Sequence, residues 1–171
     1  MKMTDLFLDE LAREADATRR TLERVPSGRA DWKPHAKSMS LGRLSTLVAS
    51  MPSWIATMVN RDELDMRPAG GEGYVPPPEL RTSNELVASL ESHVSNAQEA
   101  LQRTNDQHLM TPWRFLVAGR VVSELPRYQM IRDAVFNHLA HHRGQLTVYL
   151  RLNDAAVPAI YGPSADEGQF E

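Results

Sequence analysis

The sequence is best approached from one stretch, Asn137-His138-Leu139-Ala140-His141-His142-Arg143-Gly144-Gln145-Leu146. It lies in a segment, about Arg127–Asn153, whose apolar residues recur at helical spacing. Residues four apart share one face of a helix, with Cβ atoms about 5–6 Å apart. His138 and His142 can therefore point two imidazoles at one place, which is the geometry that a divalent metal ion requires.

The spacing H-x3-H is by itself a weak signal, and two ordinary polar histidines are the alternative interpretation. The position after His138 is Leu139, so the glutamate that serves as general base in the metalloprotease helix motif is missing, and that class is excluded. His141 lies off the shared face of His138 and His142. We expect it in a polar outer stripe, or as a hydrogen-bonding partner of a ligand.

Three further segments carry a helical period. The first is about Asp5–Val25, with Thr4 or Asp5 as its cap and Pro26-Ser27-Gly28 after it. The second is about Leu41–Asn60, which Pro52 should kink or split because proline lacks a backbone donor and clashes with the preceding turn. The third begins with a capping box at Thr82-Ser83-Asn84-Glu85 and extends to about Asn105.

Two non-helical stretches connect these segments. Residues 62–78 are rich in proline and glycine and are long enough to cross from one end of a bundle to the other. Residues 111–124 contain alternating apolar residues around Ala118-Gly119-Arg120, which predicts a short hairpin. The sequence thus predicts one all-α domain over residues 1–171. We expect a four-helix bundle with a long crossover loop and a short hairpin or extended segment before the last helix.

Composition excludes several functions. Cysteine is absent from the 171 residues, which rules out disulfides, cysteine ligands and a cysteine nucleophile. The net charge is −3 and no basic stripe is visible, so we expect no nucleic-acid partner. No apolar run approaches the roughly 20 residues of a membrane span, and the acidic start does not resemble a secretory signal. We therefore expect no membrane association and a cytoplasmic location.

The wider sequence resembles the DinB family (DinB/YfiT-like metalloenzymes). The resemblance rests on His138–Leu146 with the following Tyr149-Leu150-Arg151, on the tail from Val157 to Glu167, and on the lead into the second helix. That lead reads Asp31-Trp32-Lys33-Pro34-His35 and then Lys37-Ser38-Met39-Ser40-Leu41-Gly42-Arg43-Leu44. The resemblance to the family covers nearly the whole chain, and the motif in the last helix is its most specific part.

The resemblance implies a four-helix bundle, often a homodimer, with a divalent metal ion held by three histidines. Two would be His138 and His142, and the third would come from the second helix in the pattern L-G-x-L-x-x-H. Here the third position is Leu47, which cannot bind metal and continues an apolar stripe. We therefore expect a divalent ion such as zinc, nickel or iron to be weakly bound or absent.

Other residues are candidates for the same site. His93, at the edge of the apolar face of the third helix, is a possible substitute ligand, and a boundary histidine with one hydrogen bond is the alternative. Leu47, His141, Gln145 and Tyr149 are expected to line the pocket or to support the ligands. Trp54 and Trp113 either wall this pocket or belong to the core. Arg143 is expected to pair with Asp166 or Glu167 of the tail.

Two functions follow from these patterns. The first is a metal-dependent enzyme of the DinB type, a thiol transferase or hydrolase acting on an unknown small molecule, with a degenerate metal site. The second is a catalytically silent bundle that binds a small molecule or another protein. Leu47 discriminates between them, because a third ligand near His138 and His142 favours the enzyme.

Overall fold

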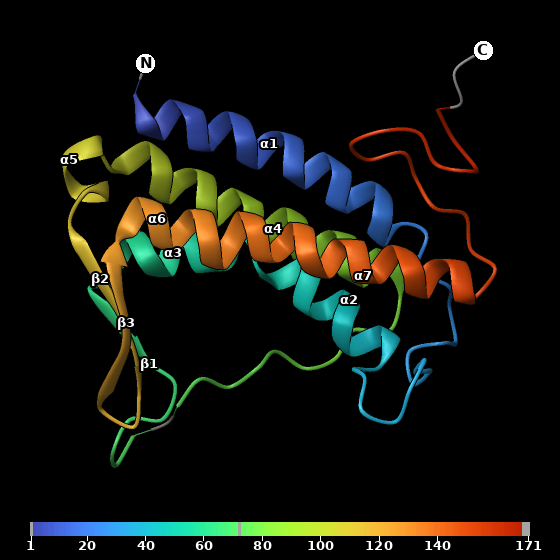
Figure 1. Cartoon of the computed structure of the whole chain (residues 1–171), viewed down its shortest axis with the longest axis horizontal. Helices are drawn as coiled ribbons and strands as arrows, with labels where there is room; N and C mark the ends of the chain where they lie inside the picture. Colours follow the sequence, from blue (N-terminus) through green and yellow to red (C-terminus); the bar gives the residue numbers. More distant parts are fainter. Residues whose placement is uncertain (1, 72, 169–171) are drawn as a thin grey trace.

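Four helical rods lie side by side in the computed structural model, with a small sheet at one end (Figure 1). The structure describes residues 2–71 and 73–168. The predicted domain, residues 1–171, therefore includes positions outside the described residues. The helices are α1 (Met3–Leu22), α2 (Leu41–Ser50), α3 (Ser53–Asn60), α4 (Ser83–Arg103), α5 (Asp106–Leu109), α6 (Arg127–Ile131), the π-helix η1 (Arg132–Asn137) and α7 (His138–Leu152).

The fold is mostly helical, as predicted, but a purely all-α bundle is not confirmed, because three short strands form a sheet. They are β1 (Glu63–Asp65), β2 (Pro112–Val117) and β3 (Arg120–Pro126), in the order β1-β2-β3. The antiparallel β2–β3 pair confirms the predicted hairpin, and β1 pairs in parallel with β2. Strand β1 lies inside the predicted loop, where three residues are too few to show a period. The rest of that loop crosses the bundle to the start of α4 (Figure 1).

Asp65 of β1 fixes the turn of the hairpin. Its carboxylate accepts hydrogen bonds from the backbone amides of Ala118 and Gly119 at 3.0 and 2.7 Å, and from that of Arg67 at 2.8 Å. Both turn residues have positive φ, 53° for Ala118 and 75° for Gly119, as a two-residue hairpin turn requires. The hydrogen bonds from these backbone amides hold the pKa of Asp65 below its usual value, and the bond from Arg67 has the largest effect.

Two local signals in the sequence are confirmed. Pro52 separates α2 from α3, so the second helical segment is split. Thr82 caps α4, with its hydroxyl accepting from the Glu85 amide and the Glu85 carboxylate accepting from the Thr82 amide. The two signals succeed because each depends on residues within one turn of the chain.

The cap of α1 differs from the prediction. The helix begins at Met3, and the Asp106 carboxylate of α5 accepts from the Met3 amide at 2.9 Å and from the Thr4 amide at 3.3 Å. Asp5 accepts from the Lys2 amide at 3.3 Å. The free amides at the start of a helix can be satisfied by any nearby acceptor, and here one comes from a residue a hundred positions away.

The last rod is not one regular α-helix. The π-helix η1 occupies residues 132–137, directly before His138. The predicted inner residues Ile131, Val135 and Leu139 are all buried, as are Leu146 and Leu150. A π turn includes one more residue per hydrogen-bonded ring than an α turn. Such turns occur often at functional sites, so η1 indicates that the region around His138 is a candidate site.

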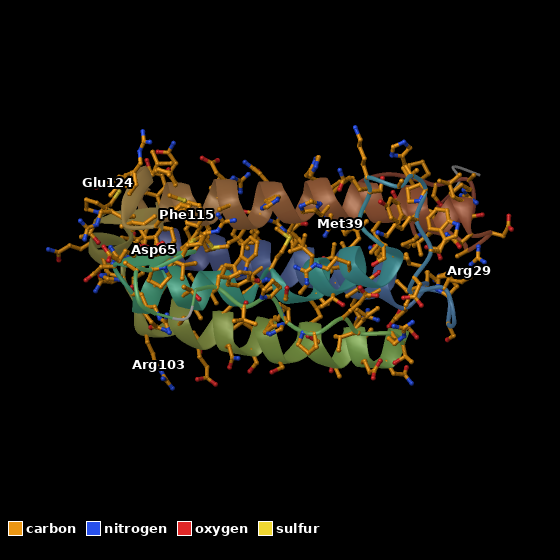
Figure 2. The ribbon with its side chains drawn as sticks, turned by 90° about the horizontal axis from the view of Figure 1, so that it is seen from below. Arg29, Met39, Asp65, Arg103, Phe115 and Glu124 are labelled. Atoms are coloured by element: carbon orange, nitrogen blue, oxygen red, sulfur yellow. The ribbon has the colours of Figure 1, made fainter. Side chains whose placement is uncertain are left out.

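Two apolar clusters hold the rods together. One, near the sheet, contains Phe7, Ile55, Trp113 and Phe136, and the other, towards the far end, contains Leu22, Leu44, Leu90 and Leu146. Trp54 packs against both. Figure 2 shows the two ends, with Asp65 and Phe115 at the sheet and Met39 and Arg29 opposite. Trp54 therefore lies where the two halves of the core meet.

Two arginines are buried in the helical part. Arg127 donates to the carbonyl oxygens of Met58, Arg61 and Pro112, which joins the end of α3 to the sheet. Arg143 donates to Thr18 at 3.0 Å and to the Glu14 carboxylate at 2.6 Å, and it also bonds the Tyr161 hydroxyl.

The predicted pairing of Arg143 with Asp166 or Glu167 was wrong. Asp166 pairs with Arg151, and Glu167 pairs with Arg24. Arg143 is 1% exposed and points from α7 between the rods towards α1, whereas the tail carboxylates lie at the surface. Tyr161 is therefore the tail residue that reaches Arg143. Among residues 2–71 and 73–168, we find no helix with both the length and the apolar character needed to span a membrane.

Candidate functional site

His138 and His142 face each other at the start of α7. Their Nε2 atoms lie 2.8 Å apart, and the ring centroids are separated by 4.5 Å. This distance is within the span of two Zn–N bonds of about 2.0–2.1 Å each. The predicted convergence of the two imidazoles is therefore present in the structure, and its cause is their separation by one helical turn.

The partners of the Nδ1 atoms determine what the two Nε2 atoms can do. The amide nitrogen of Gln145 donates to His141 Nε2 at 3.1 Å, so Gln145 Oε1 is the atom that faces His142 Nδ1, at 2.8 Å. An amide oxygen only accepts, and Nδ1 of His142 therefore carries a proton. His138 in turn hydrogen-bonds the Ala134 backbone, and Nδ1 is the nitrogen left for it.

Both Nε2 atoms consequently present lone pairs to each other in the neutral rings. Two lone pairs at 2.8 Å repel each other unless a cation, either a proton or a metal ion, lies between them. Hydrogen bonds from Nδ1 to oxygen acceptors are also the arrangement that orients histidine ligands in metal sites. This part of the chain thus has the donor set and the supporting contacts of a two-histidine metal centre.

The surroundings of His138 disfavour its protonated form. Burial, and then the nearby His142, hold the pKa of His138 below its usual value. The Trp54 ring lies 5.9 Å from the His138 ring, and His142 is partly buried. A neutral imidazole is the form that binds metal, so these surroundings suit a ligand.

An apolar cavity of about 300 Å³ adjoins His138. Its walls come from α3, β1, the crossover loop, the hairpin and the last rod. They include Trp54, Met58, Leu64, Met66, Tyr74, Trp113, Phe115, Met130, Ala134 and His138, with Thr57 and Ser123 as hydroxyl residues. The volume is at the lower end of the range for small-molecule sites. Trp113 is thus a wall residue and a buried core residue at once, and Trp54 is a partly buried wall residue that packs against the core.

Neither Leu47 nor His93 is a wall residue of the apolar cavity beside His138. Leu47 is partly buried on α2 and packs against the apolar cluster of the far end, and it is not a wall residue of the cavity. His93 of α4 donates from Nδ1 to the Ala49 carbonyl at 3.2 Å and lines a neighbouring polar pocket. Among residues 2–71 and 73–168, no three histidine, aspartate or glutamate side chains are grouped closely enough to hold one ion.

Tyr149 supports the site from a distance. Its hydroxyl donates to the Met39 carbonyl at 3.3 Å, and its ring meets Trp32 edge-on at 5.5 Å. These contacts fasten α7 to the segment that leads into α2. Gln145, by contrast, hydrogen-bonds both His142 and His141, and the His141 ring lies 5.0 Å from the His142 ring.

Comparison with known proteins now identifies the fold and the family. The model of the DinB family matches residues 1–171. The chain belongs to the DinB family. It is 29% identical over 164 residues to the uncharacterised protein YrdA of Bacillus subtilis (strain 168), covering 95% of this chain and 90% of that protein.

Two solved structures of DinB-like proteins share the fold. One, from Bacillus cereus ATCC 10987, gives a TM-score of 0.70 at 23% identity and covers 91% of this chain and 95% of that one. The other, YjoA from Bacillus subtilis, gives a TM-score of 0.65 at 15% identity, covering 88% and 94% of the two chains. At these identities the likeness extends to the fold alone, so the site must be argued from the residues of this DinB-family chain.

Several site residues of this DinB-family protein were missed from the sequence. Leu64, Met66 and Tyr74 reach the cavity from β1 and the crossover loop, and Ser123 reaches it from β3. None belongs to a periodic stretch that marks a buried face. The parallel pairing of β1 with β2 brings β1 and its loop beside His138, and no local signal in the sequence indicates that pairing, whereas Ser123 arrives with β3 of the hairpin.

Proposed function

We propose that this protein is a metal-dependent enzyme of the thiol-transferase or hydrolase type, acting on a small and partly apolar molecule. The observation that carries the proposal is the pair of Nε2 atoms 2.8 Å apart, whose Nδ1 atoms are held by oxygen acceptors. The apolar cavity beside His138 gives a substrate a place to bind next to the two histidines.

The residues present fit a divalent ion with limited affinity. Two imidazoles suit zinc, nickel or iron. DinB-family membership implies a third histidine at the position of Leu47, whose side chain cannot coordinate a metal. His93 stays the substitute predicted from the sequence: its Nε2 carries a lone pair when Nδ1 donates to Ala49, although among the described residues it is not grouped with His138 and His142. A substrate atom is the other group able to complete the site.

A bound divalent ion supplies Lewis acidity and makes a nucleophile available near neutral pH. The chain itself supplies orientation and a dry environment. Gln145 and the Ala134 carbonyl fix the ring orientations of His142 and His138. Trp54 covers one side of His138, and the apolar walls exclude water from the body of the substrate.

A second function is favoured by Leu47 specifically. With an apolar side chain at the third position, the protein would bind a small apolar molecule in the cavity without chemistry. The same cavity serves both functions, so metal content is the property that separates them. Homodimer formation and a cytoplasmic location stay predictions.

The test is elemental analysis by mass spectrometry of untagged protein purified without chelator. We compare the wild type with the double variant His138→Ala/His142→Ala and with His35→Ala, which removes an exposed histidine outside the site. Near-stoichiometric metal that is lost only in the double variant supports the enzyme. A folded wild type that is metal-free and takes up none from micromolar zinc or nickel overturns it and leaves the binding function.

A further inference from the structure

A second, polar pocket adjoins the apolar cavity. It measures about 570 Å³ and lies between α3, α4, β1 and the crossover loop. Trp54, Thr57, Leu64 and Tyr74 line both spaces, so the two pockets are neighbours that share these four side chains. A ligand that fills the apolar compartment beside His138 would therefore extend its other end into the polar one.

The helical walls of the polar compartment present hydrogen-bond acceptors. The Ser53 hydroxyl donates to the Ser50 carbonyl at 2.7 Å, and the Thr57 hydroxyl donates to the Ser53 carbonyl at 3.5 Å. With these protons directed at the helix carbonyls, each hydroxyl oxygen keeps a lone pair that can accept from a ligand. The same holds for His93, whose Nδ1 proton lies on the Ala49 carbonyl, 3.2 Å away, and leaves Nε2 as an acceptor.

The charges that line this compartment favour a cation. Among the residues that the structure describes, they comprise the carboxylates of Glu63 and Asp65 and one guanidinium, that of the exposed Arg61. Asp65 accepts from three backbone amides, which keep its pKa low and its carboxylate ionised. Glu63 shares its charge with Arg114 at 2.6 Å. Among the described lining residues, two carboxylates therefore stand against one guanidinium.

We propose that the polar compartment binds a primary ammonium group of a substrate whose apolar body occupies the compartment beside His138. An ammonium has three donors and no acceptor, which complements oxygen and imidazole acceptors beside ionised carboxylates. This inference rests on the proposed function, in which the same apolar cavity receives the substrate. It adds the chemical class of the substrate, an amine that is apolar over the rest of its length.

The first test measures binding of two probes of similar size, 2-phenylethylamine and 3-phenylpropionate, to full-length protein in EDTA. Chemical shifts of the Trp54 indole and isothermal titration report the dissociation constants. We expect the amine to bind at least about tenfold more tightly than the acid, a difference of about 1.4 kcal/mol. Equal binding, tighter binding of the acid, or no binding of either probe overturns the proposal.

Variants then locate the ammonium. Ser53→Ala/Thr57→Val removes two acceptor oxygens, and we expect it to weaken binding of the amine about fivefold or more, since one hydrogen bond contributes about 0.5–1.5 kcal/mol. Thr147→Val is the matched control, because the Thr147 hydroxyl also donates to a helix carbonyl, that of Gly144, but lines neither compartment. Circular dichroism checks that each variant is folded, and the isosteric Thr57→Val alone serves if the double variant is not.

Unchanged binding of the amine in a folded variant overturns the assignment, as does an equal loss in Thr147→Val. The assay contains no metal, so its outcome is separate from that of the proposed function. A protein that binds the amine but no divalent ion loses the enzyme proposal and keeps this one. A protein that binds metal at His138 and His142 but does not bind the amine keeps the enzyme proposal and loses the assignment of the polar compartment to an ammonium group.

Discussion

Gln145 Oε1 lies 2.8 Å from His142 Nδ1 and fixes the ring orientation of that histidine. Gln145 is exposed on α7 and contacts no metal-binding nitrogen directly. Its effect on a bound ion is therefore indirect, through the tautomer of His142.

We expect Gln145→Leu to weaken divalent-metal binding about 10–100-fold, the usual cost of losing a hydrogen-bond partner of a ligand. Competition with a coloured zinc chelator measures the affinity. Gln102→Leu, an exposed glutamine on α4, is the control and should bind as the wild type does. If the two variants bind equally well, His142 is not oriented for a metal by Gln145.

Leu47→His restores the third histidine of the family pattern, and we expect at least about a tenfold gain in affinity for zinc or nickel. Leu47→Phe introduces a ring without ligand atoms and controls for the change in packing on α2. The same chelator competition provides the affinities. No gain for the histidine variant relative to the phenylalanine variant would show that Leu47 does not occupy the position of a ligand.

Arg143→Met should lower the free energy of unfolding by about 3–5 kcal/mol, because it leaves the Glu14 carboxylate without its buried partner. The Arg143 and Glu14 side chains are 1% and 13% exposed, and their atoms lie 2.6 Å apart. Urea unfolding followed by circular dichroism measures the difference. Arg151→Met breaks an ion pair with Asp166 that is far more exposed, and we expect it to cost less than about 1 kcal/mol. Similar losses in both variants would contradict the structural role assigned to Arg143.

Tyr161 should titrate above the usual tyrosine range. Burial of its hydroxyl, and then the hydrogen bond to Glu14, raise the pKa of Tyr161. The folded protein thus holds this proton more tightly than the unfolded chain. The resulting stabilisation is complete below the unfolded pKa of about 10 and is lost as pH rises through the folded pKa.

Ultraviolet difference titration at alkaline pH measures this effect by comparing the wild type with Tyr161→Phe. We expect the difference between the two proteins, which is the titration of Tyr161, to occur at a higher pH than that of a free tyrosine. Glu14→Gln keeps a similar shape while removing the carboxylate charge, and should lower the pKa of Tyr161. If Tyr161 titrates in the ordinary range of a free tyrosine, the contact between the tail and α1 does not persist in solution.

Much of the architecture could be predicted because it depends on neighbours in sequence. The helical segments followed from the spacing of apolar residues, and Pro52 split α2 from α3 within the segment where it was expected to. The capping box of α4 and the β2–β3 hairpin are also contained within a few residues. The facing of His138 and His142 belongs to the same class, since one helical turn separates them.

The tertiary structure decided the features that join distant residues. The β1–β2 pairing links residues some fifty positions apart, and it places Leu64 beside Phe115 and brings β1 and the crossover loop to the cavity near His138. The partners of Arg143 and the cap of α1 come from packed neighbours.

The sequence by itself thus determined the helical rods, the split at Pro52 and the facing of His138 and His142, because each arises from contacts within one or two turns. Only the tertiary structure decided what surrounds that pair: the apolar cavity, the polar compartment and the place of Leu47 away from the cavity walls. The physical reason is that a pocket is the space left between packed elements. Its shape depends on how those elements pair and cross, which no local pattern of residues records.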